Sequence, residues 1–160
     1  MESICYKPIG FIETPFDDRE GMPIQATGGA GVRGRIRLLE EYGPGLKDLD
    51  GFSHLILIYH FHLTRDSQLV VTPFLDTTPR GVFATRSPNH PNPVGLSIVR
   101  LLEIRGTTLE IEDLDIVNGT PLVDIKPYVP VFDHREPERL GWLAKAGGAT
   151  KQTRADRRFK

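Results

Sequence analysis

The sequence predicts an all-β fold, a compact β-barrel of short strands followed by one helix near the C-terminus. Thirteen prolines and sixteen glycines interrupt the 160 residues at short intervals, which argues against a helical protein. The segments between them are rich in β-branched and aromatic residues and are bounded by turn residues. Many short strands at regular spacing are typical of a barrel or a sandwich.

Eight segments fit this description of a strand. They are residues 7–13, 34–40, 54–63, 68–74, 81–85, 96–104, 108–116 and 121–126. A hairpin is expected to turn at Arg105 and Gly106. The segment "EPERLGWLAKAGG" predicts the helix, because Pro137 suits a first helical turn and the two glycines at its end would stop it.

Composition indicates an ordinary soluble globular protein, with 39% hydrophobic and 26% charged residues. The longest dense apolar run, Leu55 to Tyr59, is far too short to cross a bilayer. The first ten residues lack the basic and apolar regions of a signal peptide. Cys5 is the single cysteine, so no internal disulfide and no cysteine metal cluster can form. We therefore expect a cytoplasmic protein.

Charge is spread unevenly along the chain. The net charge is −1, but the last ten residues hold five basic residues and one acid, while the other 150 hold fifteen basic and twenty acidic residues. We expect one barrel domain over residues 1–150 and a basic tail over residues 151–160. The tail would either reach nucleic-acid phosphates or be a solvated terminus.

Two motifs match known ligand-binding patterns only in part. The segment "GAGVRG", Gly29 to Gly34, matches the dinucleotide-binding pattern, but a loop precedes it where that pattern needs a buried strand. We expect a flexible glycine-rich loop. His54, His60 and His62 lie on one predicted strand, and neighbouring imidazoles can bind zinc. The ligand set is incomplete, so hydrogen bonding within the barrel wall or to a ligand is the preferred interpretation, and no metal is expected.

The loop "TRSPNHPNPVGLS", Thr85 to Ser97, combines rigidity with polar groups. Each of its three prolines holds the preceding residue in an extended or turn conformation, which limits the entropy lost on binding. Arg86 brings a permanent charge and a rigid fork of donors. The amides of Asn89 and Asn92 can recognise donors and acceptors on a nucleobase or an amino-acid group.

A second polar stretch runs from Asp115 to Asp133. Asn118 and Gly119 form a tight-turn pair. Strand alternation places Asp124 and Lys126 on one face, with Tyr128 close behind. This arrangement is either a simple ion pair that anchors the backbone or part of a site, and the residues alone leave both open.

These two stretches, "RSPNHPNPVGLSIVRLLEI" and "DIVNGTPLVDIKPYVPVFD", resemble the TsaA-like family, also called TrmO-type. "PIGFIETPF", "MPIQA" and "LDGFSHLILIYHFH" resemble its other segments in the same order. The resemblance covers roughly residues 7–133.

The resemblance implies a β-barrel that binds S-adenosylmethionine, is a homodimer with the cofactor near the subunit interface, and methylates N6 of threonylcarbamoyladenosine beside the anticodon of tRNA. The implied cofactor residues are Pro23, Gln25, Phe61, His62, Arg86, Asn118, Gly119 and Thr120. The implied catalytic residues are Asp124, Lys126, Tyr128 and Asn92, with Asp124 as a base that accepts a proton directly or through water.

This chain departs from the family at two points. It has His90 where the family often has arginine, and it ends soon after the predicted helix, where larger members carry a further domain thought to help grip tRNA. Two other classes compete with the methyltransferase. One is a non-enzymatic module that senses S-adenosylmethionine or another small metabolite. The other is a metal-dependent hydrolase built on the three histidines.

Overall fold

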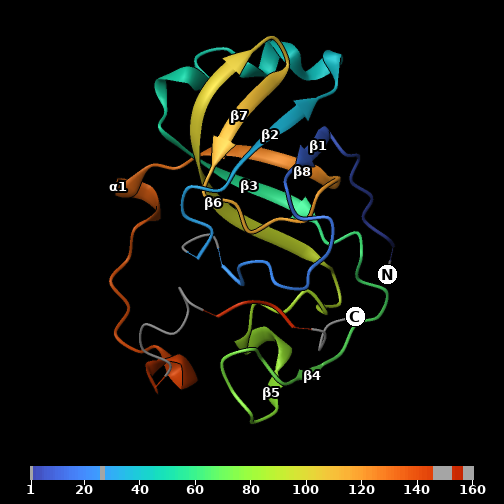
Figure 1. Ribbon diagram of the computed structural model, residues 1–160, viewed down its shortest axis with the longest axis vertical. Coiled ribbons are helices and arrows are strands. Elements are labelled where there is room, and N and C mark those ends of the chain that lie inside the picture. Colours follow the sequence, from blue (N-terminus) through green and yellow to red (C-terminus); the bar gives the residue numbers. More distant parts are fainter. Residues whose placement is uncertain (1, 26–27, 146–152, 157–160) are drawn as a thin grey trace.

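Six antiparallel strands close into a barrel, which confirms the predicted fold class (Figure 1). The computed structural model describes residues 2–25, 28–145 and 153–156. Around the barrel the strands follow the order β1-β2-β7-β6-β3-β8. Their bounds are β1 Gly10–Glu13, β2 Arg33–Leu38, β7 Thr108–Glu112, β6 Val94–Arg105, β3 His54–His60 and β8 Thr120–Pro127.

The core follows from strand alternation. On β3, Leu55, Leu57 and Tyr59 are buried, while the residues between them are partly exposed. Successive side chains of a strand point to opposite faces, so one set fills the barrel and the other faces outward. The equivalent positions of the other strands complete a single core: Ile12, Ile36, Leu38, Val99, Leu109, Ile111 and Leu122, joined by Leu114 and Ile116 from the segment before β8.

The long β6–β7 hairpin turns where the sequence predicts. Arg105 is paired with Thr108, and Gly106 between them has a φ of 60°. Strand β7 is shorter than expected and ends at Glu112. Asp113 has a left-handed φ of 71°, and its carboxylate accepts a hydrogen bond from the backbone N–H of Gly31 at 2.9 Å. That conformation ends the strand.

The glycine-rich segment leads into β2, and Gly34 lies within that strand. A dinucleotide-binding motif needs a helix at this point. The structure has a strand there, so the dinucleotide-binding interpretation is excluded, and the expected loop ends where β2 begins at Arg33. Two 3₁₀ segments, η2 (Glu40–Leu46) and η3 (Leu49–Gly51), connect β2 to β3.

A small second sheet lies at the lower end of the molecule in Figure 1. It pairs β4 (Val70–Val71) with β5 (Arg80–Gly81), and the 3₁₀ turn η4 (Val82–Ala84) follows. Both strands are shorter than the predicted 68–74 and 81–85. Proline residues flank them and cannot donate to a strand ladder, so pairing stops after two residues.

The predicted helix at residues 136–148 is wrong over the part that the structure describes. A four-residue helix, α1 (Pro130–Asp133), precedes it, and a 3₁₀ segment, η5 (Gly141–Lys145), lies inside it. Pro137 disfavours helical geometry at Glu136, and Gly141 has a left-handed φ of 57°. Residues 146–148 lie outside the described part. Within the described ranges, no helix has the length and apolar character needed to cross a membrane.

Candidate functional site

A cavity of about 340 Å³ lies at the end of the barrel where β3 finishes and where β6 and β8 begin. The barrel contributes Tyr59, Gly95, Leu96 and Thr120 to its wall. The loop after β3, the segment before β2, the proline-rich loop and the described C-terminal residues complete it. Its volume falls within the range of about 300–1,000 Å³ that is typical of small-molecule sites.

Six of the eight predicted cofactor residues line this cavity. They come from four separate parts of the chain and are Pro23, Gln25, Phe61, His62, Arg86 and Thr120. The closed barrel brings them together, because the end of β3 and the starts of β6 and β8 lie side by side in antiparallel register. Sequence motifs that are far apart thus meet at one rim.

Arg86 connects two sides of the rim. Its guanidinium donates a hydrogen bond to Gln25 Oε1 at 3.2 Å. The backbone after it is fixed by Thr85, whose Oγ1 accepts from Ser87 N at 3.3 Å and donates to the Val82 carbonyl at 2.8 Å. The charge of Arg86 is therefore held at the cavity by a braced loop, as the proline content of the loop predicts.

His62 faces Thr120 across the cavity wall. Thr120 Oγ1 donates its hydrogen to the Val117 carbonyl at 2.7 Å, so it can only accept from His62 Nδ1, which lies 3.4 Å away. Burial, followed by the charges of Arg19 and His60, lowers the pKa of His62. The imidazole is neutral at pH 7 and presents its other nitrogen as an acceptor.

A chain of three side chains connects the barrel core to the cavity. Ser97 Oγ donates to Asp115 Oδ1 at 2.6 Å, which leaves Tyr59 OH, 2.9 Å from Ser97 Oγ, as the donor to Ser97. Burial, then the nearby carboxylate of Asp115, raises the pKa of Tyr59 well above its ordinary value. Asp115 lines the cavity and brings a carboxylate to its wall.

The sequence-based prediction missed Asp115 as a site residue. The only signal available was its position three residues before the Asn118–Gly119 turn. Nothing in the strand pattern indicates that Ser97, at an inward position of β6, would hold this carboxylate.

The described C-terminal residues form another part of the wall that was missed. Gly21 N donates to the Ala155 carbonyl, and Ala155 N donates to the Met22 carbonyl, each at 2.9 Å. Pro23 and Arg154 form an antiparallel bridge beside them. Ala155 and Asp156 therefore line the cavity. A segment predicted only as a basic tail contributes backbone pairing next to the site.

The two remaining predicted cofactor residues form the turn that leads into Thr120. Asn118 N donates to the Phe16 carbonyl at 2.7 Å, and Asn118 Oδ1 accepts from Thr14 N at 3.1 Å. Gly119 has a left-handed φ of 75° that favours glycine. Asn118 and Gly119 are not part of the cavity wall, and they position Thr120.

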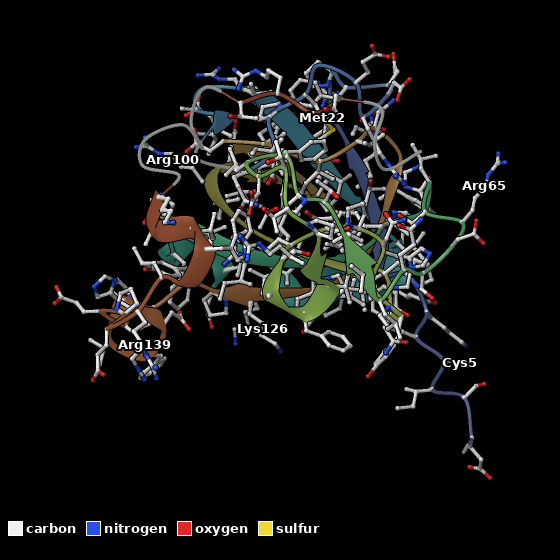
Figure 2. All side chains as sticks on the ribbon, turned by 90° about the horizontal axis from the view of Figure 1, so that it is seen from below. Cys5, Met22, Arg65, Arg100, Lys126 and Arg139 are labelled. Carbon is white, nitrogen blue, oxygen red and sulfur yellow. The ribbon has the colours of Figure 1, made fainter. Side chains whose placement is uncertain are left out.

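The four predicted catalytic residues lie outside the cavity wall of this chain. Lys126 Nζ is 2.7 Å from Asp124 Oδ2 in a solvent-exposed ion pair. Tyr128 N donates to the carbonyl of His54, at the opposite end of β3 from the cavity. In Figure 2, Lys126 and the cavity residue Met22 lie on opposite sides of the molecule. Asn92 is exposed just before β6.

In the proline-rich loop, Asn89 has a structural contact. Asn89 is 6% exposed, its side-chain nitrogen donates to the Asp66 carbonyl at 3.2 Å, and its backbone carbonyl accepts from Gln68 N at 2.9 Å. These bonds anchor the loop, while the side-chain oxygen of Asn89 is buried without a hydrogen-bond partner among the described residues, and Asn89 lies outside the cavity wall. His90 is part of the cavity wall, and its Nε2 lies 3.3 Å from the Thr85 carbonyl.

The three histidines of the predicted β3 segment do not form a cluster. His54 Nδ1 is hydrogen-bonded to Ser53 Oγ at 2.9 Å, His60 is exposed at the end of β3, and His62 lies in the loop beyond. Within residues 2–25, 28–145 and 153–156, no group of three or more histidine, cysteine or acidic side chains is arranged to hold a metal ion.

Comparison with known proteins relates this site to a family. The model of the tRNA-methyltransferase O N-terminal domain matches residues 11–134. A probable S-adenosyl-L-methionine-binding protein of Pyrococcus abyssi is 50% identical over 98% of this chain and 85% of its own. A tRNA (adenine(37)-N6)-methyltransferase of Escherichia coli is 37% identical over 93% of this chain and 67% of its own.

Solved structures agree with the sequence comparison. A crystal structure of TrmO from Pseudomonas aeruginosa superimposes with a TM-score of 0.75 at 32% identity. The alignment covers 89% of this chain but only 62% of that one, so the chain spans less than two thirds of this structural neighbour. By the match of its whole barrel, this chain belongs to the tRNA-methyltransferase O family.

Proposed function

We propose that this protein is an S-adenosylmethionine-dependent methyltransferase that acts on N6 of threonylcarbamoyladenosine next to the tRNA anticodon. The observation that supports it is the convergence of six predicted cofactor residues on one cavity in a member of this family. Relatives named as S-adenosyl-L-methionine-binding proteins support the cofactor, and those named as tRNA (adenine(37)-N6)-methyltransferases support the reaction. We propose that it acts on tRNA in the cytoplasm.

The residues present fit S-adenosylmethionine. The cofactor combines a flat base, a polar sugar, and an amino-acid end with a cationic sulfonium and an ammonium group. The cavity offers apolar surface from Phe61 and Ile116, hydrogen-bonding groups from Gln25 and Arg86, and the Asp115 carboxylate for positive charge. Carboxylates form strong charge-assisted hydrogen bonds with cations, so the half-buried Asp115 suits the cationic end.

S-adenosylmethionine, when bound, supplies the methyl group of its sulfonium. The chain must orient donor and acceptor and exclude water, and such positioning lowers barriers by roughly 7–11 kcal/mol in favourable cases. Phe61 packs edge-on against Tyr59 with ring centroids 5.4 Å apart, which fixes an apolar wall. The Arg86–Gln25 hydrogen bond fixes another part of the rim.

We further propose that the protein works as a homodimer through the outer face of β6 and β3. Val94, Leu96 and Ile98 are 52%, 54% and 39% exposed on this face, and the first two also line the cavity. An exposed apolar row that continues into a ligand cavity is a typical interaction surface. A second copy on this face would lie next to the cofactor.

In the proposed dimer, the predicted catalytic residues of one copy could contact the tRNA acceptor bound at the other. Ile58 is paired with Leu96 on one side and with Asp124 on the other, so the three lie in one row across the outer face. In a two-fold dimer over this row, Asp124 and Lys126 of one copy approach the cavity rim of the other. We propose that Asp124 there accepts the N6 proton and that Lys126, Tyr128 and Asn92 contact the modified adenosine.

A non-enzymatic S-adenosylmethionine sensor is the second candidate. It is supported by the names of the archaeal relatives, which describe binding only, and by the separation of the predicted catalytic residues from the cavity within one chain.

The deciding experiment is a methyl-transfer assay. The purified protein and labelled S-adenosylmethionine are mixed with tRNA that carries threonylcarbamoyladenosine, and in parallel with the same tRNA that lacks the modification. We expect label only in the modified tRNA. Cofactor binding in a calorimeter without label in either tRNA would contradict the methyltransferase and favour the sensor.

A further inference from the structure

A second cavity of about 580 Å³ adjoins the first and is not explained by cofactor binding. Six residues belong to the walls of both cavities: Ile24, Gln25, Phe74, Thr85, Arg86 and Ser87. A ligand in the second cavity would therefore meet a ligand in the first across Gln25 and Arg86. A methyl acceptor in the second cavity would therefore lie next to the methyl donor in the first.

The second cavity presents aromatic side chains. Phe83 is 78% exposed on η4, and its ring contacts His90 edge-on at a centroid distance of 5.7 Å. Trp142 from η5 also lines this cavity. An exposed aromatic ring at the edge of a cavity offers a flat surface on which a planar ligand can stack.

The indole of Trp142 is held in place by residues of η4 and β5. Its Nε1 donates to the Ala84 carbonyl at 2.8 Å, and the Arg80 guanidinium lies 5.9 Å from the ring centroid. Arg80 is itself fixed by Asp76 through hydrogen bonds of 2.7 and 2.9 Å. In Figure 1 the turn of η5 and the strands β4 and β5 lie at the same end of the molecule. The aromatic surface is therefore pre-organised.

We infer that the second cavity binds an unstacked purine base of the RNA acceptor, with the base against Phe83 and Trp142 and its exocyclic nitrogen directed past the shared wall towards the cofactor cavity. This inference rests on the proposed methyltransferase function and specifies where its acceptor binds. Enzymes that modify a base remove it from its stack and hold it between aromatic or apolar side chains.

The chemistry of the cavity favours a nucleobase over an apolar peptide. Flat aromatic rings give stacking contacts that every base can use. The wall also contains the exposed guanidinium of Arg86, which suits an acceptor on the edge of a base or the phosphate beside it. An apolar peptide segment would leave the Arg86 charge buried against it, at a cost.

The test uses Trp142 as the reporter, because it is the single tryptophan of the chain. The full protein, with and without S-adenosylmethionine, is titrated with an anticodon stem–loop RNA that carries threonylcarbamoyladenosine. Stacking of the base on the indole is expected to quench the Trp142 emission to saturation. An abasic stem–loop at the same position is expected to bind through its phosphates with no quench.

A kinetic comparison provides the second measurement. Phe83→Ala is expected to raise the KM for RNA by at least about five-fold, the size of one lost base-stacking contact, without changing the affinity for S-adenosylmethionine. Phe132→Ala is the matched control, because Phe132 is 71% exposed on α1 and belongs to the wall of neither cavity. It is expected to leave both values unchanged.

The outcomes separate this inference from the proposed function. Methylation without a quench, and with an unchanged KM in Phe83→Ala, would overturn the base site and leave the methyltransferase intact. A base-dependent quench without methylation would support the base site and contradict the methyltransferase. Absence of both would overturn both.

Discussion

The orientation of the Asp115 carboxylate at the cavity wall is set by its hydrogen bonds. Ser97 holds its carboxylate at 2.6 Å, and Tyr59 supports Ser97 from within the core, so the negative charge at the cavity wall is fixed in direction. A fixed carboxylate suits a cationic ligand because no rearrangement is needed when the ligand binds.

We expect Asp115→Asn to weaken S-adenosylmethionine binding by about ten-fold, or about 1.4 kcal/mol. The asparagine oxygen still accepts from Ser97, but the negative charge is lost. Titration calorimetry measures the change. Glu103→Gln is the control, since Glu103 is an exposed carboxylate paired with Arg105 and remote from the cavity wall. Equal affinities in Asp115→Asn and the wild type would contradict this role.

His62 gives the protein a pH dependence of predictable sign. Its pKa is lowered in the folded protein, first by burial and then by Arg19 and His60. Between the lowered value and the ordinary value of about 6.5, the unfolded chain therefore binds more protons than the folded one. The stability contribution is complete above pH 6.5 and is lost as the pH falls through that window.

Thermal unfolding between about pH 5 and pH 7.5 tests this expectation. The wild type is expected to lose more stability on acidification than His62→Gln, which cannot titrate at this position. Affinity for the cationic cofactor is expected to fall over the same range, because a protonated imidazole would repel it. Identical pH profiles for the two proteins would show that His62 does not titrate as proposed.

At the scale of elements, the contact between β3 and β6 depends on a glycine. A Cβ at Gly95 would overlap the ring of Tyr59, which is paired with it across the two strands. The close approach lets the Tyr59 hydroxyl reach Ser97 on the same strand. The absence of a side chain at Gly95 is thus needed both for packing in the barrel core and for the shape of the cavity wall.

Gly95→Ala is expected to destabilise the protein by about 1–3 kcal/mol through overpacking, and to weaken cofactor binding because Gly95 lines the cavity. Denaturant unfolding measures the first effect. Gly45→Ala is the matched control, because a Cβ at Gly45 meets no neighbour. A fully stable Gly95→Ala protein would show that β3 and β6 can separate without cost.

The C-terminal segment can be tested as an element of the cavity. A chain ended after residue 152 loses the backbone hydrogen bonds of Ala155 with Gly21 and Met22. We expect its affinity for S-adenosylmethionine to fall several-fold, about 1 kcal/mol per lost hydrogen bond at most, while its circular dichroism stays that of the barrel.

A chain ended after residue 156 is the control for that truncation. It keeps the described wall segment and removes three basic residues, Arg157, Arg158 and Lys160. Normal cofactor binding with weaker, less salt-dependent tRNA binding would support the basic tail as a phosphate contact. Equal loss of cofactor binding in both truncations would contradict the role of Ala155.

For the whole molecule, the proposed homodimer is the feature with the largest consequences. Ile98→Lys places a charge on the exposed apolar face of β6 without altering the cavity wall. Sedimentation is expected to show a dimer for the wild type and a monomer for this variant, because a buried unpaired charge is costly. Val131→Lys, at an 83% exposed position of α1, should not change the mass. A wild-type monomer would contradict the dimer.

The sequence by itself determined the barrel and named six residues that line the first cavity. Strand composition and turn residues are local properties, so β3 and β6 could be predicted close to their observed bounds, and the motif resemblance supplied Arg86, Gln25 and their partners. The prediction of a C-terminal helix was wrong because Pro137 and Gly141 disfavour helical geometry there, although the segment has residues that are typical of helix ends.

Only the tertiary structure decided which polar residues share a space. Asp115 faces the cavity because Ser97, from a different strand, holds it there, and Ala155 lines it because it pairs with Met22 across most of the chain. Asp124 and Lys126 point outward because a register shift of β8 at Ile58 and Tyr59 sets their face. Contacts between distant segments depend on closure and register, which no local pattern specifies.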